Sequence, residues 1–220
     1  MGFEWDFAAV WQHSDMLFEG ALGTLQLAVV SIFFGVIVGA LLATARLSTH
    51  RGMSLPATCF VEFFRNTPPL VHFFWFFYAL PIVAGISLSP FWAAALALST
   101  QSGAFYAEVF RGGIKSIERG QWEGGRSIGL TSKTIMRRII LPQAFKRMAG
   151  PFMERTFELT KTTTLASTLA FGELLYQAMQ VNAITYRPLE VYSTIALMFF
   201  FFLLVMSMCM KWVEYKITAN

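Results

Sequence analysis

The sequence predicts an all-α integral membrane protein that forms a single domain over residues 1–220. Hydrophobic residues make up 55% of the chain and charged residues only 14%, whereas a soluble domain averages about 25% charged residues. Long apolar runs recur along the chain at the length that crosses a hydrocarbon core. Lys and Arg number 17 against 13 Asp and Glu. Because these positive charges are not part of a soluble fold, we expect them to meet membrane lipid and no nucleic acid.

Four apolar segments are long enough to span a membrane, since a helix needs about 20 apolar residues to do so. The four segments are residues 20–45, 56–83, 89–110 and 190–212. Gly35 and Gly39 form G-x-x-x-G in the first, which is a packing motif for membrane helices. In the second, Pro68, Pro69 and Pro81 are expected to bend or end helical pieces.

The positions of Lys and Arg predict the orientation of these segments. The first 45 residues contain neither residue type, and residues 81–90 contain no charge. Residues 46–55 contain Arg46 and Arg51, residues 111–147 contain nine basic residues, and Lys211 and Lys216 follow the last segment. Cytoplasmic loops carry the excess of Lys and Arg. The rule therefore places the N-terminus in the periplasm and the C-terminus in the cytoplasm.

A further span is required because the basic segment 111–147 and the tail lie on the same side. The only candidate is residues 143–172, which hydropathy alone would miss because it contains Glu154, Arg155, Glu158 and Lys161. The sequence therefore predicts five transmembrane helices.

The charged residues of the fourth span indicate a polar face. At 100° per residue, Glu154, Glu158 and Lys161 lie within about 60° of one another, with Arg155 and Thr162 beside them. Ionisable groups inside a membrane are costly and seldom face lipid. Two interpretations remain open, an internal network of ion pairs and the polar wall of a solute pathway.

The polar stretch 123–142 interrupts the apolar sequence. Gly124 and Gly125 are poor helix formers, but glycine allows a partner to approach the backbone closely. Gly129 is suited to end a short helix, and Pro142 to begin the fourth span. The alternative interpretation is an amphipathic segment lying on anionic lipid.

The spacing E-G-G-x3-G-x9-I-x-L-P resembles the EAA motif of the permease subunits of ABC importers. It is formed by Glu123, Gly124, Gly125, Gly129, Ile139, Leu141 and Pro142. The two alanines of the family pattern are glycines here. Residues 24–48, 61–71, 107–130 and 159–168 also resemble the polar amino-acid permease family.

The resemblance implies a type I ABC importer permease fold and a multi-pass protein of the bacterial inner membrane. A coupling helix at about 119–131 would dock on a dimer of ATPase subunits. A second permease subunit, identical or homologous, would complete the pathway, which works by alternating access. A periplasmic or lipid-anchored amino-acid-binding protein would deliver the solute.

No enzyme or cofactor site is expected in this chain. It lacks the phosphate-binding pattern G-x-x-x-x-G-K-[ST], which cradles nucleotide phosphates, so ATP and Mg would be bound by the partner ATPase. We find no catalytic constellation, and the three histidines have no metal-ligand spacing.

The resemblance also implies the residues of the substrate pathway. Ser102 and Tyr106 lie on the third span, which helps to line the pathway in the family. Where the family reads lysine, aspartate, threonine, serine, this chain has Lys161, Thr162, Thr163 and Thr164. Together with Glu154 and Glu158, these residues are the expected contacts of a polar amino acid. A cationic amino acid would fit if the acids dominate this face, and an acidic one if Lys161 and Arg155 dominate; the flanking sequence favours glutamate or aspartate.

Two other functions are compatible with parts of this pattern. An ATP-independent channel or secondary carrier would explain the polar fourth span but not the coupling motif. A membrane scaffold that docks an ATPase without transport would explain the motif but not Glu154, Glu158 and Lys161.

Overall fold

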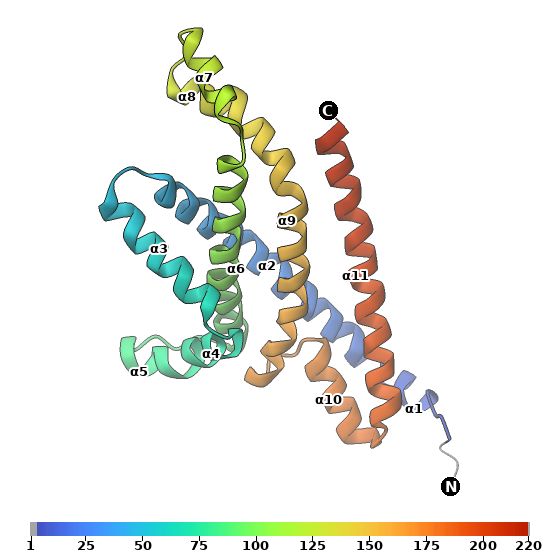
Figure 1. The fold of residues 1–220 in the computed structure, drawn as a ribbon. Helices are drawn as coiled ribbons and strands as arrows, with labels where there is room; N and C mark the ends of the chain where they lie inside the picture. The colour runs from blue at the N-terminus through green and yellow to red at the C-terminus, as the bar shows by residue number, and fades with distance from the viewer. Residues whose placement is uncertain (1–3, 220) are drawn as a thin grey trace. The chain divides into compact units, whose positions relative to one another are not determined.

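The computed structural model describes residues 4–219, and this part of the chain is helical without a strand (Figure 1). The α-helices are α1 (Ala8–Trp11), α2 (Ser14–Leu47), α3 (Arg51–Asn66), α4 (Pro69–Phe74), α5 (Leu80–Ala84), α6 (Pro90–Lys115), α7 (Arg119–Ser127), α8 (Ser132–Ile135), α9 (Leu141–Thr162), α10 (Leu174–Thr185) and α11 (Pro188–Ala219). Two π-helices, Trp75–Ala79 and Met136–Ile140, and a 3-10 helix, Thr163–Leu169, continue α4, α8 and α9. The all-α prediction is confirmed for the described residues.

The chain folds into two compact units. The first contains the residues up to Ile32, Pro68–Leu98 and Glu158–Met208, and the second contains Phe33–Thr67, Ser99–Phe157 and the residues from Cys209 onward. The long helices α2, α6, α9 and α11 each contribute residues to both units. The expectation of one domain over the whole chain stays a prediction.

Apolar side chains of distant segments form the core of the first unit. One cluster joins Leu27 of α2 and Phe73 of α4 to a run of alanines on α6. A second joins α1, α2, α10 and the start of α11 around Leu17 and Val181. Close packing of α2 depends on glycine, because a Cβ on Gly23 would lie 2.7 Å from the carbonyl oxygen of Gly172.

Glycine also sets the packing of α2 against α6 in the second unit. A Cβ on Gly39 would lie 2.7 Å from the Cβ of Tyr106, and one on Gly35 would lie 3.3 Å from its ring. On the facing helix, a Cβ on Gly103 would lie 2.6 Å from Val38. The prediction that Gly35 and Gly39 form a helix-packing motif is therefore confirmed, with α6 of the same chain as the partner.

Length and hydropathy single out fewer membrane spans than the five expected. Ser14–Leu47 and Pro188–Lys216 could each cross a membrane, and Arg51–Asn66 with Pro69–Ala84 would add a third as a broken pair. Helices α6 and α9 are not among them. The run STQSG lowers the hydropathy of α6, and α9 contains six charged residues. The count of five spans and their orientation stay predictions.

Two boundaries of the expected spans have local causes. The second span breaks where predicted, because α3 ends at Asn66 and α4 begins at Pro69. The fourth differs from the expected 143–172, since its α-helix ends at Thr162 and continues as the 3-10 helix Thr163–Leu169. Threonine hydroxyls compete for backbone carbonyls in this region, and Ala170 ends it with a φ of 57°.

A buried acid begins α10. The carboxylate of Glu173 accepts hydrogen bonds from the backbone N–H of Leu175 at 3.0 Å and of Tyr176 at 2.8 Å, which satisfies two free donors at the helix start. The side chain is fully buried. Burial raises the pKa of Glu173 to about 7, although these hydrogen bonds act in the opposite direction.

This pKa predicts stability that depends on pH. The folded chain holds the Glu173 proton more tightly than the unfolded chain, so the stabilisation is complete below pH 4.5 and is lost as pH rises through about 7. The shift corresponds to roughly 3 kcal/mol. We expect the melting temperature of the purified complex to fall between pH 5 and pH 8, and Glu173→Gln to flatten this slope. Glu19→Gln, at an exposed position of α2, is the matched control. An unchanged slope in Glu173→Gln would refute this assignment.

Candidate functional site

The polar stretch that interrupts the apolar sequence forms a capped helix in the second unit. Helix α7 (Arg119–Ser127) is followed by Gly129 with a φ of 78°. The N–H of Leu130 donates to the carbonyl of Gly125 at 3.1 Å, and that of Gly129 donates to the carbonyl of Arg126 at 3.0 Å. This pair of bonds is a Schellman cap, which favours glycine at the left-handed position. The prediction that Gly129 ends the helix is confirmed.

The two glycines of the motif have different surroundings. Gly125 is buried, and a Cβ there would lie 2.8 Å from Ile135 Cγ1 of α8. Gly124 has open space where its Cβ would be, and Glu123 beside it is exposed. Ile128 is 74% exposed at the end of the same helix. Gly125 therefore serves packing within the chain, while Gly124, Glu123 and Ile128 lie on the side that a partner could contact.

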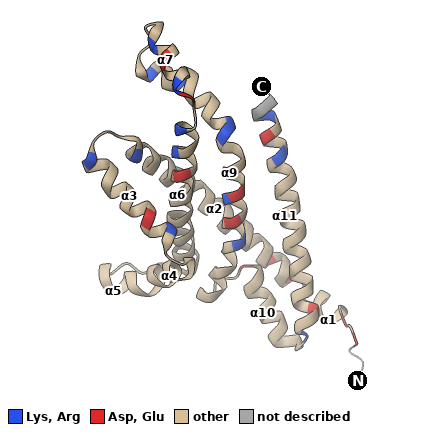
Figure 2. Ribbon diagram, viewed as in Figure 1, with Lys and Arg blue, Asp and Glu red and all other residues tan. Residues whose placement is uncertain are grey.

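The segment that connects α7 to α9 is folded into a short helix and a π-helix. Thr131 caps α8 by accepting the N–H of Thr134 at 3.3 Å, and the π-helix Met136–Ile140 leads into α9. Ile140 is buried with Ile117, Ala144 and Met148, and Ile139 packs against this cluster. Leu141 begins α9 and Pro142 follows in its first turn, as predicted. Figure 2 shows Lys and Arg along α7 and the adjoining ends of α6 and α9.

Two of the expected pathway residues lie inside the second unit. Tyr106 is fully buried and Ser102 is nearly so. The Tyr106 hydroxyl is 3.0 Å from that of Thr156, and its ring centroid is 4.8 Å from that of Phe152. In this structure Tyr106 therefore joins α6 to α9.

The charged face expected on α9 is divided between the units. Glu154 belongs to the second unit, while Glu158 and Lys161 belong to the first. All three side chains are exposed. Beside Glu154, the guanidinium of Arg155 lies 4.7 Å from the ring centroid of Phe105, a distance that favours a cation–π contact.

The threonines after Lys161 bond to their own backbone. The hydroxyl of Thr162 donates to the carbonyl of Glu158 at 2.7 Å, that of Thr163 to Thr160 at 2.7 Å, and that of Thr164 to Lys161 at 2.8 Å. Each of these hydroxyl protons is thus already donated in a hydrogen bond within the chain. Thr163 is fully buried, whereas Thr162 and Thr164 are half-buried. A solute would meet these hydroxyls as acceptors.

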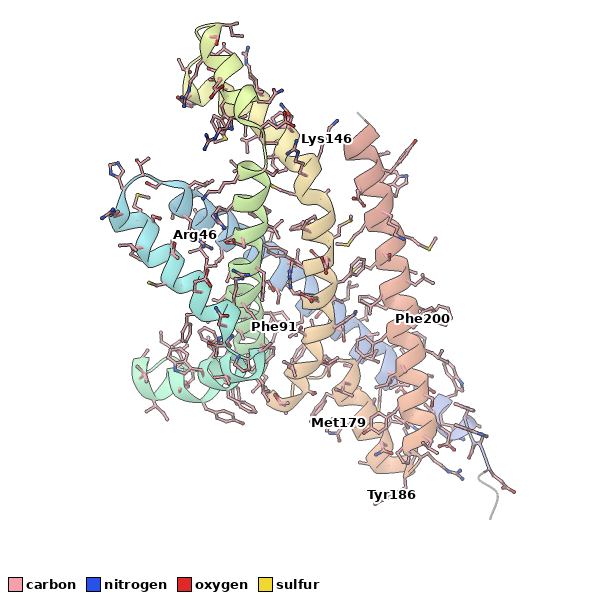
Figure 3. All side chains as sticks on the ribbon, in the orientation of Figure 1. Arg46, Phe91, Lys146, Met179, Tyr186 and Phe200 are labelled. Carbon is pink, nitrogen blue, oxygen red and sulfur yellow. The ribbon has the colours of Figure 1, made fainter. Side chains whose placement is uncertain are left out.

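Ion pairs form a network in the second unit. Arg111 Nε donates to the carboxylate of Glu108 at 3.2 Å. Arg46, labelled in Figure 3, adds a bond of 2.6 Å to Glu108 and a contact of 3.6 Å to Glu62. Glu62 also lies 3.7 Å from Arg65. The network connects the end of α2 to α3 and α6, which sequence spacing could not reveal.

Comparison with known proteins assigns the family. The family model described as binding-protein-dependent transport system inner membrane component matches residues 23–219. The chain belongs to this family. It is 32% identical to the arginine transport system permease protein ArtQ of Bacillus subtilis over 98% of each chain. It is also 32% identical to the glutamine transport system permease protein GlnP of Escherichia coli K12, over 96% of this chain and 97% of that one.

A chain of a solved amino acid ABC transporter has the same fold as this permease. A chain from the crystal structure of an amino acid ABC transporter with histidines matches with a TM-score of 0.91 and 29% identity. The match covers 97% of this permease and all of that chain. The resemblance to ABC importer permeases is confirmed, and with it the type I permease fold and a place in the membrane. The roles of the individual site residues stay predictions.

Proposed function

We propose that this chain is the membrane-spanning permease subunit of an ATP-driven, binding-protein-dependent importer of polar amino acids. The observation that carries the proposal is α7, a short helix capped by Gly129 whose exposed side presents Glu123, Gly124 and Ile128. A permease that works with a separate ATPase subunit needs an exposed helix of this kind for docking. The names of the relatives, which are permeases for arginine and glutamine, support an amino acid as the solute.

The proposed topology has five spans with the N-terminus outside. The spans would be α2, the broken segment α3 to α5, α6, α9 and α11. The positive-inside rule then places α7 and α8 in the cytoplasm. There α7 would meet a dimer of ATPase subunits, which bind ATP and Mg.

The proposed mechanism is alternating access between two permease subunits. Closure of the ATPase dimer would draw the α7 helices together and open the pathway to the periplasm, where a binding protein delivers the amino acid. An ATP-independent channel or carrier would leave α7 unexplained. A scaffold without transport would leave the charged residues of α9 unexplained, because such residues in membrane helices mark solute pathways.

The proposed solute contacts are on α9 and the segment after it. An amino acid has an ammonium group that needs acceptors and a carboxylate that needs donors. Glu154 and Glu158 would accept, Lys161 would donate, and the hydroxyl oxygens of Thr162 and Thr164 would accept. Glutamate or aspartate remains the proposed class, because Lys161 and the neighbouring Arg155 can pair with an acidic side chain.

Glu154→Gln tests the role of the acid on α9. We expect the KM for uptake to rise at least about tenfold, because a charged hydrogen bond contributes roughly 1.5–3 kcal/mol. Glu19→Gln, which removes an exposed carboxylate near the start of α2, should leave KM unchanged. Normal KM and kcat in Glu154→Gln would remove Glu154 from the pathway.

Isolation of the native complex tests the proposal as a whole. A tag on this chain should recover an ATPase and a second permease subunit from native membranes. The ATPase activity of this complex in nanodiscs should rise when binding protein and one class of amino acid are added. Recovery of the chain without an ATPase, from membranes that contain the other subunits, would contradict the proposal.

A further inference from the structure

We propose that the groove formed by α2, α6 and α9 in the second unit binds one acyl chain of an anionic phospholipid, whose headgroup pairs with Lys115 and Lys146. The inference rests on the proposed embedding of the chain in the membrane. It does not depend on which solute is carried.

Two adjoining cavities of about 380 and 270 Å³ form the groove. Val36, Phe110, Phe145 and Met148 line both of them. Among the described residues that line the groove, Thr44 alone has a polar side chain, and its hydroxyl donates to the carbonyl of Leu41 at 2.8 Å. The groove therefore offers an occupant hydrocarbon contacts and no free hydrogen-bond donor.

The sequence of α2 explains why the groove is present. The lining residues Val36, Ala40, Ala43, Thr44 and Leu47 recur at helical spacing along one side of the helix. Small side chains at the centre of this row face the large rings that α6 and α9 supply. The groove thus follows α2 for roughly 17 Å at 1.5 Å per residue.

The shape of the groove suits an extended hydrocarbon chain, because its lining is apolar and runs along one side of α2 for roughly 17 Å. Phe145 is 59% exposed although it lines both cavities, so the groove is open to the surroundings. In a membrane, the hydrocarbon beside such an opening is lipid.

Two exposed lysines directly follow residues that line the Leu47 side of the groove. Lys115 follows the lining residue Ile114, Lys146 follows Phe145, and both lysines are exposed. Figure 3 shows Lys146 on the part of α9 that leads from the basic segment. Basic pockets beside membrane helices on the cytoplasmic side attract anionic headgroups, and long lysine side chains reach the interface. A phospholipid with a negative headgroup matches both the apolar groove and its basic end.

Photolabelling of the complete transporter in proteoliposomes tests the site. Phosphatidylglycerol and phosphatidylcholine probes would carry the same diazirine-labelled acyl chain, and the labelled peptides would be mapped by mass spectrometry. We expect the phosphatidylglycerol probe to label the peptide of α9 that contains Phe145 and Met148. Labelling of the exposed side of α2 around Phe33 supplies the baseline for general lipid contact.

A matched pair of variants separates the groove from the lipid-facing surface. Ala40→Phe fills the groove from an exposed position, whereas Leu41→Phe changes a side chain that is 66% exposed and does not line it. Ala40→Phe should lower labelling of the α9 peptide at least about fivefold, and Leu41→Phe should leave it unchanged. Thr44→Phe is a second groove-filling variant should Ala40→Phe fail to assemble. Equal labelling in the wild type and both groove-filling variants would overturn the site.

Two further results bear on the headgroup and on the occupant. Lys115→Gln with Lys146→Gln should remove the preference for phosphatidylglycerol, while Lys133→Gln, at an exposed position on α8, should preserve it. A preference that survives the double substitution would contradict the headgroup assignment.

Disulfide formation between two copies of an Ala40→Cys variant would show that a second permease subunit fills the groove, which also overturns the proposal. ATP-driven uptake measured in parallel keeps either failure distinct from a failure of the proposed function.

Discussion

Replacement of Gly124 by Trp is expected to abolish ATP-driven transport while the permease still folds and inserts. Gly124 has open space where a side chain would point, so the indole would not disturb α7 itself. On the proposed docking face, however, it would hold the ATPase away from the helix. We expect retention of the ATPase on a tagged permease to fall at least about tenfold, which corresponds to 1.4 kcal/mol.

The matched control for this substitution is Gly52→Trp. Gly52 lies on α3 and also has open space around it, so it tests whether an added indole on an exposed helix is harmful in itself. Full ATPase retention and normal uptake in Gly124→Trp would refute the docking face. Gly125→Trp is a poorer test, because that residue is packed against Ile135 and its replacement would distort the segment directly.

Gly39→Leu is expected to destabilise the second unit more than any other single change considered. A Cβ at this position would already lie 2.7 Å from Tyr106 and 3.1 Å from the carbonyl oxygen of Gly103. Tyr106 cannot easily move, since it is fully buried and bonded to Thr156. Overpacking of this kind costs about 1–3 kcal/mol or more. We therefore expect a melting temperature lower by on the order of 10 °C in a chain of this size.

Gly52→Leu is the control for this prediction as well. Leucine is a better helix former than glycine, so at an open position the substitution should leave stability unchanged or raise it slightly. The measurement is thermal unfolding of both variants in the same detergent. Equal melting temperatures for Gly39→Leu and wild type would show that α2 and α6 do not pack as described.

Features with a local chemical cause were predictable from the sequence. Gly129 ends α7 because a left-handed residue favours glycine, and the break of the second span falls at Pro68 and Pro69 because proline restricts the chain before it. Gly35 and Gly39 were recognisable as a packing motif from their spacing alone. In each case the residues that produce the feature lie within a few positions of one another.

Features that depend on distant partners were not predictable. The sequence shows that Gly124 and Gly125 are both small, but only the structure shows that Gly125 packs against Ile135. The bond of Arg46 to Glu108 joins residues 62 positions apart. No spacing rule within one helix could pair them.

The residues after α9 show how local chemistry can also mislead. A run of threonines suggested hydroxyls available to a solute. In the structure these hydroxyls donate to backbone carbonyls, and the α-helix gives way to a 3-10 helix. The polar residue types therefore indicated where a solute could bind. They did not indicate which of their hydrogen-bonding groups remain available to that solute.

ATP-dependent uptake is the direct test of whether this chain works as an importer permease. The isolated complex would be placed in proteoliposomes with ATP on the ATPase side and binding protein on the other. Labelled acidic, neutral and basic amino acids would then be offered separately. We expect uptake of one class that requires ATP and is lost in Gly124→Trp. Uptake that persists without ATP, or in Gly124→Trp at the wild-type rate, would contradict this expectation.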